Sequence, residues 1–351
     1  MTASIPSRAG SRGRCCNRKS GDMAVVVDMK YFLFSILTMI VALSPACERV
    51  EKLAGGFPTP PPETVTPTKQ LPNIELKPDI DLQKRIAAIA TEAKGKVGVA
   101  AVVLETGDSV SLNADQRFPM LSVYKLPIAM AVLHSIDDEK LALDEQIGVT
   151  TDDFVSPGQR SPIRDKNPNG TSLSVSELIK YAVSESDGTA SDVLMRLADG
   201  PDEIQLYLTA IGVKEMAVVN TEKEFARDWQ TQYSNFAMPD AAITLLRCLY
   251  DGNGISADHR ELLLKFMTDS TTGPKRLKGL LPAGTAVAHK TGTSGTRDGV
   301  TAATNDIGII TMPNGKHIAI AVFVSDSPAD EKTREAVIAK IAKTVWDKWN
   351  R

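Results

Sequence analysis

Ser122 and Lys125 are the first two residues of the chain that could carry out chemistry together. They stand three residues apart where a loop gives way to an apolar helical segment, so their side chains share one helix face, roughly 5–6 Å apart at Cβ. A serine in the first turn lies beside unpaired backbone N–H groups and the positive end of the helix dipole, which favour a developing oxyanion. The lysine is the nearest group that could accept the hydroxyl proton. Taken alone, such a pair is more often an N-capping serine and a solvated lysine.

Two further short motifs follow in the chain. Residues 186–188 read Ser-Asp-Gly between two predicted helices, where the hydroxyl of Ser186 could reach a leaving group, although the tripeptide alone is typical of a turn. Lys290, Thr291 and Gly292 end a predicted strand. A lysine and a threonine there would suit a substrate carboxylate, and the glycine would let a ligand approach the backbone closely. Alone, this motif also fits an edge strand with a protective lysine.

In this order, Ser-x-x-Lys, Ser-Asp-x and Lys-Thr-Gly resemble the signature of class A β-lactamases and penicillin-binding proteins. The compact spacing is similar to that of the single-domain class A enzymes and differs from that of the larger transpeptidases. The resemblance spans residues 79–351. It implies a serine hydrolase that opens the β-lactam amide bond of antibiotics through an acyl-serine intermediate, which a glutamate-activated water then releases.

The resemblance also requires a glutamate on a long loop between the second and third motifs. Glu222 and Glu224 are both available there, and the segment 228–236 resembles the loop of the extended-spectrum branch of class A. That alignment favours Glu222, with Phe225 as the apolar residue that holds the loop down. Glu222 decides between functions, because a transpeptidase lacks this base and stays acylated.

The resemblance implies a role for each matching residue. Ser122 would attack the lactam carbonyl, and either Lys125 or Glu222, acting through a water, would take its proton. The N–H groups of Ser122 and Thr293 would form the oxyanion hole. Ser186 would pass a proton to the lactam nitrogen. The residues expected to bind the substrate are Lys290, Thr291, Gly292, Ser294 and Arg276. In some family members an arginine placed like Arg276 supplies a second positive charge. The alternative for Arg276 is that of a solvated loop residue.

Three residues depart from the family pattern. Gly188 replaces an asparagine whose amide usually binds the substrate's side-chain amide, and Ala226 replaces an asparagine that normally helps to hold the deacylating water. Arg160 stands where an aromatic residue commonly walls the cleft. Rate and substrate range therefore stay open. So do two alternatives, a D-alanyl-D-alanine carboxypeptidase or transpeptidase and a non-hydrolysing β-lactam-binding sensor.

The elements that must position these residues follow from periodicity. Alternating or continuous apolar runs predict strands at both ends of the chain, at 97–105, 109–113, 285–290, 305–312 and 317–325. A 3.6-residue period predicts a helix through Leu82, Ile86 and Ile89 and others at 122–136, 174–184, 189–198, 201–211, 239–250, 257–268 and 329–349. We therefore predict an α/β fold of the α+β type. A mostly antiparallel sheet is flanked by N- and C-terminal helices, and an all-helical lobe (about 115–284) is inserted between its second and third strands. The active-site cleft is expected at the lobe junction.

Composition disfavours other classes. Of the 351 residues, 42% are hydrophobic and 24% charged, and the net charge of −3 gives no argument for a nucleic acid or an anionic membrane surface as partner. Only Cys248 lies in the globular part, so no disulfide framework is expected, and the four histidines show no metal-ligand spacing. We expect no cofactor, a small-molecule β-lactam as the partner, and a monomer.

The N-terminal region is typical of an exported protein. Residues 1–46 are expected to be an export signal with an upstream basic extension, because the apolar run at 31–43 is too short to span a bilayer, which needs about 20 residues. The position of Cys47 favours a lipid anchor. Residues 47–79 are a Pro/Thr-rich linker, and 80–351 form the catalytic domain. We expect a periplasmic protein, anchored to the membrane as a lipoprotein.

Overall fold

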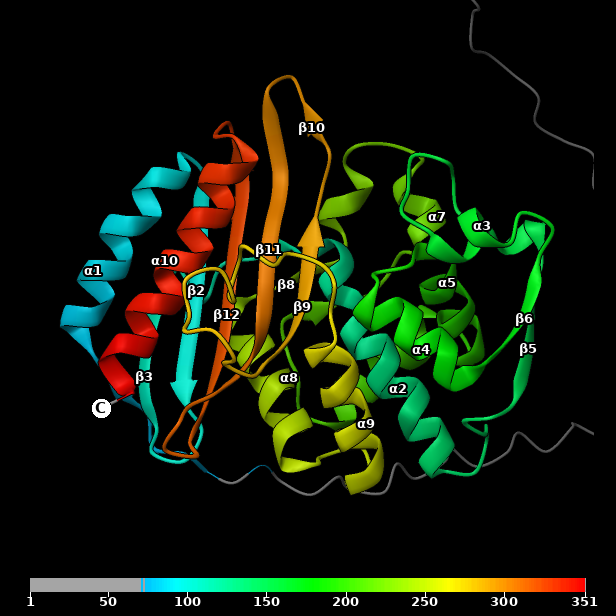
Figure 1. Ribbon diagram of the computed structural model, residues 1–351, viewed down its shortest axis with the longest axis horizontal. Helices are drawn as coiled ribbons and strands as arrows, with labels where there is room; N and C mark the ends of the chain where they lie inside the picture. The colour runs from blue at the N-terminus through cyan, green and yellow to red at the C-terminus, as the bar shows by residue number, and fades with distance from the viewer. Residues whose placement is uncertain (1–70, 72, 351) are drawn as a thin grey trace, which may run out of the picture. The chain divides into compact units, whose positions relative to one another are not determined.

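The computed structural model describes residues 71 and 73–350, which are arranged around one sheet (Figure 1). The strand order is β1-β3-β2-β12-β11, and β9 and β10 both pair with the remaining edge of β11. Only the pairing of β1 with β3 is parallel. The strands are β1 (Lys77–Pro78), β2 (Lys96–Val103), β3 (Asp108–Leu112), β9 (Val287–Thr293), β10 (Thr296–Arg297), β11 (Val300–Thr311) and β12 (His317–Ser327). The predicted, mostly antiparallel sheet from both ends of the chain is confirmed.

Both faces of the sheet are covered, which explains why its central strands are apolar throughout. Val99 on β2 and Ile320 on β12 belong to the core that packs under α1 (Ile80–Ala90) and α10 (Glu331–Trp349). Val102 and Phe323, on the opposite face of the same strands, belong to the larger core shared with the inserted lobe. The two terminal helices therefore cover one face, as the sequence predicted (Figure 1).

The lobe is inserted between β3 and β9 and is mostly helical. Its helices are α2 (Lys125–Asp137), α3 (Pro162–Lys166), α4 (Val175–Ser184), α5 (Gly188–Leu197), α6 (Pro201–Ala210), α7 (Glu222–Phe225), α8 (Pro239–Asp251) and α9 (Ala257–Thr268). The expectation of an all-helical lobe needs one correction, because β5 (Gln146–Val149) and β6 (Thr171–Ser174) form a two-stranded sheet in it. A second small sheet joins β4 (Phe118–Pro119), β8 (Phe236–Ala237) and β7 (Met216–Ala217). Strands of two to four residues are too short to show a period.

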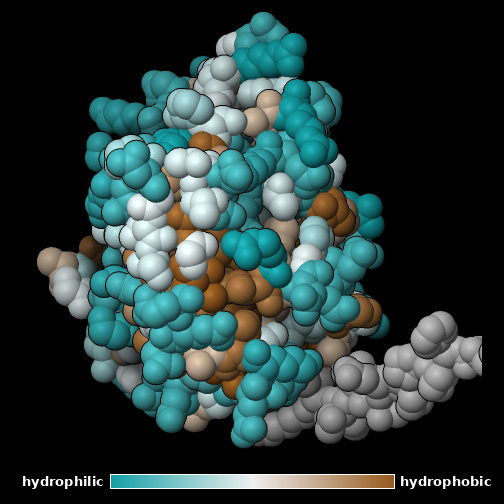
Figure 2. Space-filling model, turned by 90° about the vertical axis from the view of Figure 1, so that its right-hand side faces the viewer, coloured by the Kyte–Doolittle hydropathy of each residue, from teal (hydrophilic) through white to brown (hydrophobic). Residues whose placement is uncertain are grey.

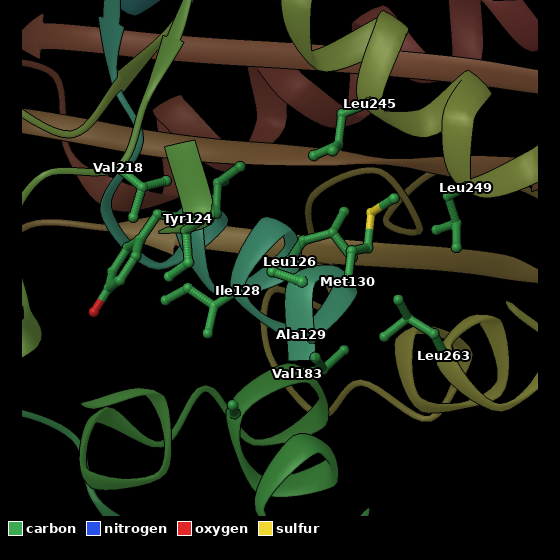
Figure 3. Close-up of a cluster of buried hydrophobic side chains, with 14 of the residues drawn as sticks. Tyr124, Leu126, Ile128, Ala129, Met130, Val183, Val218, Leu245, Leu249 and Leu263 are labelled. Atoms are coloured by element: carbon green, nitrogen blue, oxygen red, sulfur yellow. The ribbon is translucent and has the colours of Figure 1, made fainter. Parts of the chain in front are cut away.

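Helix α2 runs through the middle of the lobe core. All residues from Lys125 to Leu133 are buried, because a helix that is apolar all round can be covered on every side. Figure 3 shows side chains from α4, α8 and α9 gathered around it, among them Val183, Leu245 and Leu263. This packing fixes the start of α2, where Lys125 lies.

The face of the lobe in Figure 2 is mostly hydrophilic and surrounds a patch of hydrophobic residues. No helix in the described part of the chain is long and apolar enough to cross a membrane. The predicted export signal, Cys47 and most of the predicted linker lie outside the described residues. At the end of that predicted linker, Lys77–Pro78 forms β1.

Candidate active site

Ser122 lies in a single 3₁₀ turn, Leu121–Tyr124, and α2 begins only at Lys125. The predicted helix at 122–136 thus starts as a tighter turn. Leu121 enters it with a φ of +45°, a left-handed conformation that is uncommon for a branched residue. No side chain caps this turn or α2, and Lys125 is 1% exposed. The alternative of an N-capping serine and a solvated lysine is therefore wrong.

The side chain of Lys125 contacts three other residues of the site. Its Nζ lies 3.2 Å from Ser122 Oγ and 3.0 Å from Glu222 Oε2, and it donates to the carbonyl oxygen of Ser186 at 3.1 Å. One buried cation therefore joins the serine of the first motif, the loop of the second motif and the predicted base.

Glu222 is the first residue of the four-residue helix α7. A capping box forms its N-terminus: the Glu224 carboxylate accepts the Thr221 N–H at 2.9 Å, and Thr221 Oγ1 accepts the Glu224 N–H. Asp192 on α5 accepts the N–H groups of Glu222 and Lys223 at 2.6 and 3.0 Å, and burial raises the pKa of this aspartate to about 6. Glu224 is thus engaged in capping, whereas the side chain of Glu222 faces Lys125, as the alignment favoured.

Ser186 and Lys290 connect the lobe to the sheet. Ser186 has a φ of +58°, and its Oγ accepts a hydrogen bond from Lys290 Nζ at 2.9 Å. Lys290 is fully buried on β9, so it is not the exposed edge lysine of the alternative interpretation. Burial, together with the nearby charge of Lys125, holds the pKa of Lys290 well below its usual value. Asp187 fixes the loop by accepting the Ala190 N–H at the start of α5.

Gly292 lets the nucleophile turn approach β9 closely. A Cβ at this position would lie 2.2 Å from the carbonyl oxygen of Met120, just before the 3₁₀ turn. Asn305 on β11 holds the same segment, because its Nδ2 donates to the carbonyl oxygens of Pro119 and Met120. Since the Ser294 N–H donates to β11 and N–H directions alternate along a strand, the N–H of the preceding Thr293 points to the free edge of β9.

Arg276 is buried beside the cleft, so it is not a solvated loop residue. Its Nη1 donates to the carbonyl oxygens of Gly292 and Asn305, its Nη2 donates to Thr293 Oγ1 at 2.8 Å, and its Nε pairs with Glu335 at 3.2 Å. The guanidinium therefore brings a positive charge to the end of β9 while most of its N–H groups are already engaged.

These residues line or underlie one cleft of about 640 Å³ at the junction of lobe and sheet. The lining residues include Ser122, Ser186, Glu222, Arg276, Thr291, Thr293 and Ser294. Arg160 and Ala226 also line it, while Gly188 lies directly behind Glu222. Every predicted site residue thus lies in this cleft or against it. In the described residues, no group of three or more His, Cys, Asp or Glu could hold a metal ion.

Sequence reasoning missed two residues that shape the site. Tyr124 lies inside the first motif, and its hydroxyl donates to Glu222 Oε2 at 2.9 Å. Its ring also meets Phe225 edge-on at 5.5 Å, which agrees with the predicted role of Phe225 in holding the loop. Asn305, described above, is the second. Three successive polar residues in the middle of an otherwise apolar strand, Thr304, Asn305 and Asp306, were the signal that could have found it.

The environment of Gly188 makes a testable prediction. A Cβ on this residue would lie 2.7 Å from Glu222 Cγ, so Gly188→Asn, which introduces the usual family residue, must displace the glutamate. We expect this variant to lose about tenfold in kcat, because small displacements of a catalytic group are costly. Steady-state kinetics with a chromogenic cephalosporin measures the change. An increase in kcat for Gly188→Asn would contradict this account.

Comparison with known proteins agrees with the site. A family model described as the β-lactamase enzyme family matches residues 81–349. The chain is 40% identical to β-lactamase VEB-1 of Pseudomonas aeruginosa over 269 residues, which cover 76% of this chain and 90% of the relative. It is 41% identical to extended-spectrum β-lactamase PER-1 of the same organism over 265 residues, 76% of this chain and 86% of that one.

Solved structures agree as well. A β-lactamase from Chitinophaga pinensis superposes with a TM-score of 0.75 at 46% identity, covering 76% of this chain and 99% of the other. The TLA-1 extended-spectrum β-lactamase gives a TM-score of 0.75 at 44% identity, with coverages of 77% and 99%. Fold and cleft together define a serine β-lactamase of class A. The chain belongs to the β-lactamase enzyme family, and the predicted likeness to its extended-spectrum branch is confirmed.

Proposed function

We propose that this protein hydrolyses the amide bond of β-lactam antibiotics by way of an ester on Ser122. The observation that carries the proposal is the contact of one buried nitrogen, Lys125 Nζ, with both Ser122 Oγ and Glu222 Oε2. Acyl transfer to a serine needs a group to take its proton, and release of the ester needs a base to activate water. The cleft holds both within hydrogen-bonding distance of one another.

In the first step, Ser122 Oγ bonds to the lactam carbonyl carbon and the ring C–N bond breaks. The serine proton leaves through a water to Glu222, or directly to Lys125 Nζ when that nitrogen is a neutral amine. The backbone N–H groups of Ser122 and Thr293 stabilise the oxyanion. The released nitrogen takes a proton from the Ser186 hydroxyl. Lys290 Nζ donates to Ser186 Oγ at 2.9 Å, so the lysine can return a proton to this oxygen.

In the second step, water attacks the carbonyl carbon of the ester. Its proton passes to Glu222, and the bond from carbon to Ser122 Oγ breaks. The serine oxygen takes a proton from Lys125 Nζ, which Glu222 replaces because Nζ contacts both residues. The substrate carboxylate is held on the sheet side of the cleft by Lys290, Thr291 and Ser294, next to Gly292. Arg276 acts there mainly through its charge, because its N–H groups are bonded to Thr293, Glu335 and backbone.

A turnover assay with a chromogenic cephalosporin tests the proposal against its alternatives. We expect many turnovers per enzyme, and no turnover by Ser122→Ala. A mass adduct that accumulates on the unmutated protein without turnover would instead indicate a β-lactam-binding sensor. Release of D-alanine from a D-alanyl-D-alanine peptide, with slow β-lactam turnover, would indicate a peptidase.

We also propose that the protein is exported to the periplasm as a monomer and carries acyl chains on Cys47. The apolar run at 31–43, the small residues before the cysteine and the proline-rich segment after it support this proposal. Mass spectrometry of the mature N-terminus would contradict the lipid anchor if Cys47 carries no acyl chain. Light scattering checks the monomer.

A further inference from the structure

Tyr124 lies between Ser122 and Lys125 in the sequence, and its side chain is fully buried. Its ring lies among hydrophobic side chains of the lobe core, whereas its hydroxyl points away from the other labelled residues (Figure 3). A buried phenol needs a hydrogen-bond partner for its polar end. The hydroxyl has two: Glu222 Oε2 at 2.9 Å and Ser191 Oγ at 3.1 Å.

The direction of these hydrogen bonds follows from the donors available. An ionised carboxylate only accepts, so the single phenol proton points to Glu222. Ser191 Oγ lies 2.9 Å from the carbonyl oxygen of Gly188, to which it can donate. Burial raises the pKa of Tyr124 well above its usual value, so the hydroxyl keeps its proton and stays a donor.

Positions 188 and 226, on either side of Glu222, carry no polar side chain. The Cβ direction of Gly188 points at Glu222 Cγ, and residue 226 is an alanine that lines the cleft. In the described part of the chain, the side-chain donors that reach the Glu222 carboxylate are Lys125 and Tyr124, and both reach Oε2. A carboxylate fixed through one oxygen keeps the other, Oε1, for water.

We propose that Tyr124 is a positioning residue for Glu222, whose hydroxyl orients the carboxylate and stabilises its ionised form for release of the acyl-enzyme. The inference rests on the proposed function. The Lys125 contact alone could not do this, because that ammonium is shared with Ser122 and Ser186. The phenol is committed to Glu222, and packing of its ring leaves it one orientation.

The consequence is specific to the second half of the reaction. Deacylation has Glu222 as its base, whereas acylation can also use Lys125, which the Tyr124 hydroxyl does not contact. Because a hydrogen bond to a carboxylate favours the ionised form, its loss makes protonation of the base easier. We therefore expect Tyr124→Phe to slow deacylation and to move the acid limb of the kcat profile to higher pH.

Other charged groups that face Glu222 also influence the pH profile. They are Lys125 on α2, Asp192 on α5 and Lys290 on β9. The aspartate, whose pKa burial raises to about 6, contributes its own limb to the profile of both proteins. The quantity to read is therefore the displacement between the parent protein and Tyr124→Phe.

The test compares Tyr124→Phe with Tyr207→Phe in stopped-flow acylation and deacylation of a slow cephalosporin substrate. Tyr207 is a matched control, because it is also buried in the lobe and its hydroxyl has no hydrogen-bond partner in the described residues. We expect Tyr124→Phe to slow deacylation about tenfold and acylation less than threefold, with its acid limb displaced upward in pH. Tyr207→Phe should change neither rate nor limb.

Three outcomes would overturn the proposal. They are an unchanged deacylation rate, an unmoved acid limb, and an equal fall of both rates accompanied by a lower melting temperature, which marks a merely structural role. Failure of the proposed function would appear differently, as absence of turnover in the parent protein.

Discussion

Glu222→Gln is expected to turn the enzyme into one that is acylated and then stops. Ser122 keeps Lys125 at 3.2 Å, so the ester can still form, but an amide cannot take the proton from the attacking water. We expect deacylation to slow by about 10²- to 10⁴-fold, the usual contribution of a general base. Intact-protein mass spectrometry after mixing with a cephalosporin should show one stable adduct, and peptide mapping should place it on Ser122.

Glu224→Gln is the matched control. It makes the same chemical change two residues away, and glutamine is also accepted at this position of a capping box, so the N-terminus of α7 is kept. We expect near-normal turnover from this variant. If Glu224→Gln accumulates the adduct and Glu222→Gln turns over normally, the two glutamates have been assigned the wrong way round.

Gly292→Ala is expected to separate the nucleophile, Ser122, from the end of β9, where the Thr293 N–H contributes to the oxyanion hole. The added Cβ would lie 2.2 Å from the Met120 carbonyl oxygen, a contact with backbone that cannot be relieved by rotating a side chain. The turn that carries Ser122 must therefore move away from Thr293. A displacement of about 1 Å in an active site can cost 10²-fold, and we expect kcat/KM to fall by about that factor.

The destabilisation of this variant should be modest. Overpacking of this kind typically costs about 1–3 kcal/mol, so the protein should still fold. Gly148→Ala is the control, because a Cβ there meets nothing within 4 Å and the residue lies on β5, away from the cleft. Kinetics and thermal unfolding of the two variants separate loss of geometry from loss of stability. Unchanged kcat/KM in Gly292→Ala would refute the close approach.

The sequence predicted the parts of the site that consist of residue types at short spacing. Ser122 and Lys125 are adjacent on one turn, so their contact follows from local geometry. The long helices and strands were also predictable, because their apolar periods run over many residues. The order of the motifs then placed Glu222 on the intervening loop through the resemblance to a known family.

What could not be predicted depends on contacts between distant segments. The phenol of Tyr124 bonds to a residue 98 positions away, and nothing in the local sequence distinguishes it from an ordinary core aromatic. The buried state of Arg276 follows from carbonyl groups of β9 and β11 that meet only in the folded sheet. The steric clash between a side chain at position 188 and Glu222 likewise exists only once the two segments meet in the folded protein.

The three contacts of Lys125 make the site a single thermodynamic unit. Removing Glu222 changes the charge balance around the same ammonium that serves Ser122, and removing the ammonium leaves a carboxylate without its counter-charge. The effects of paired substitutions among these residues will therefore not add, as is usual for groups that act together. Substitutions that change the activity in small steps are more easily tolerated at the rim of the cleft. Arg160 is such a position, because it lines the cleft and bonds to the carbonyl oxygen of Glu185 instead of to Lys125.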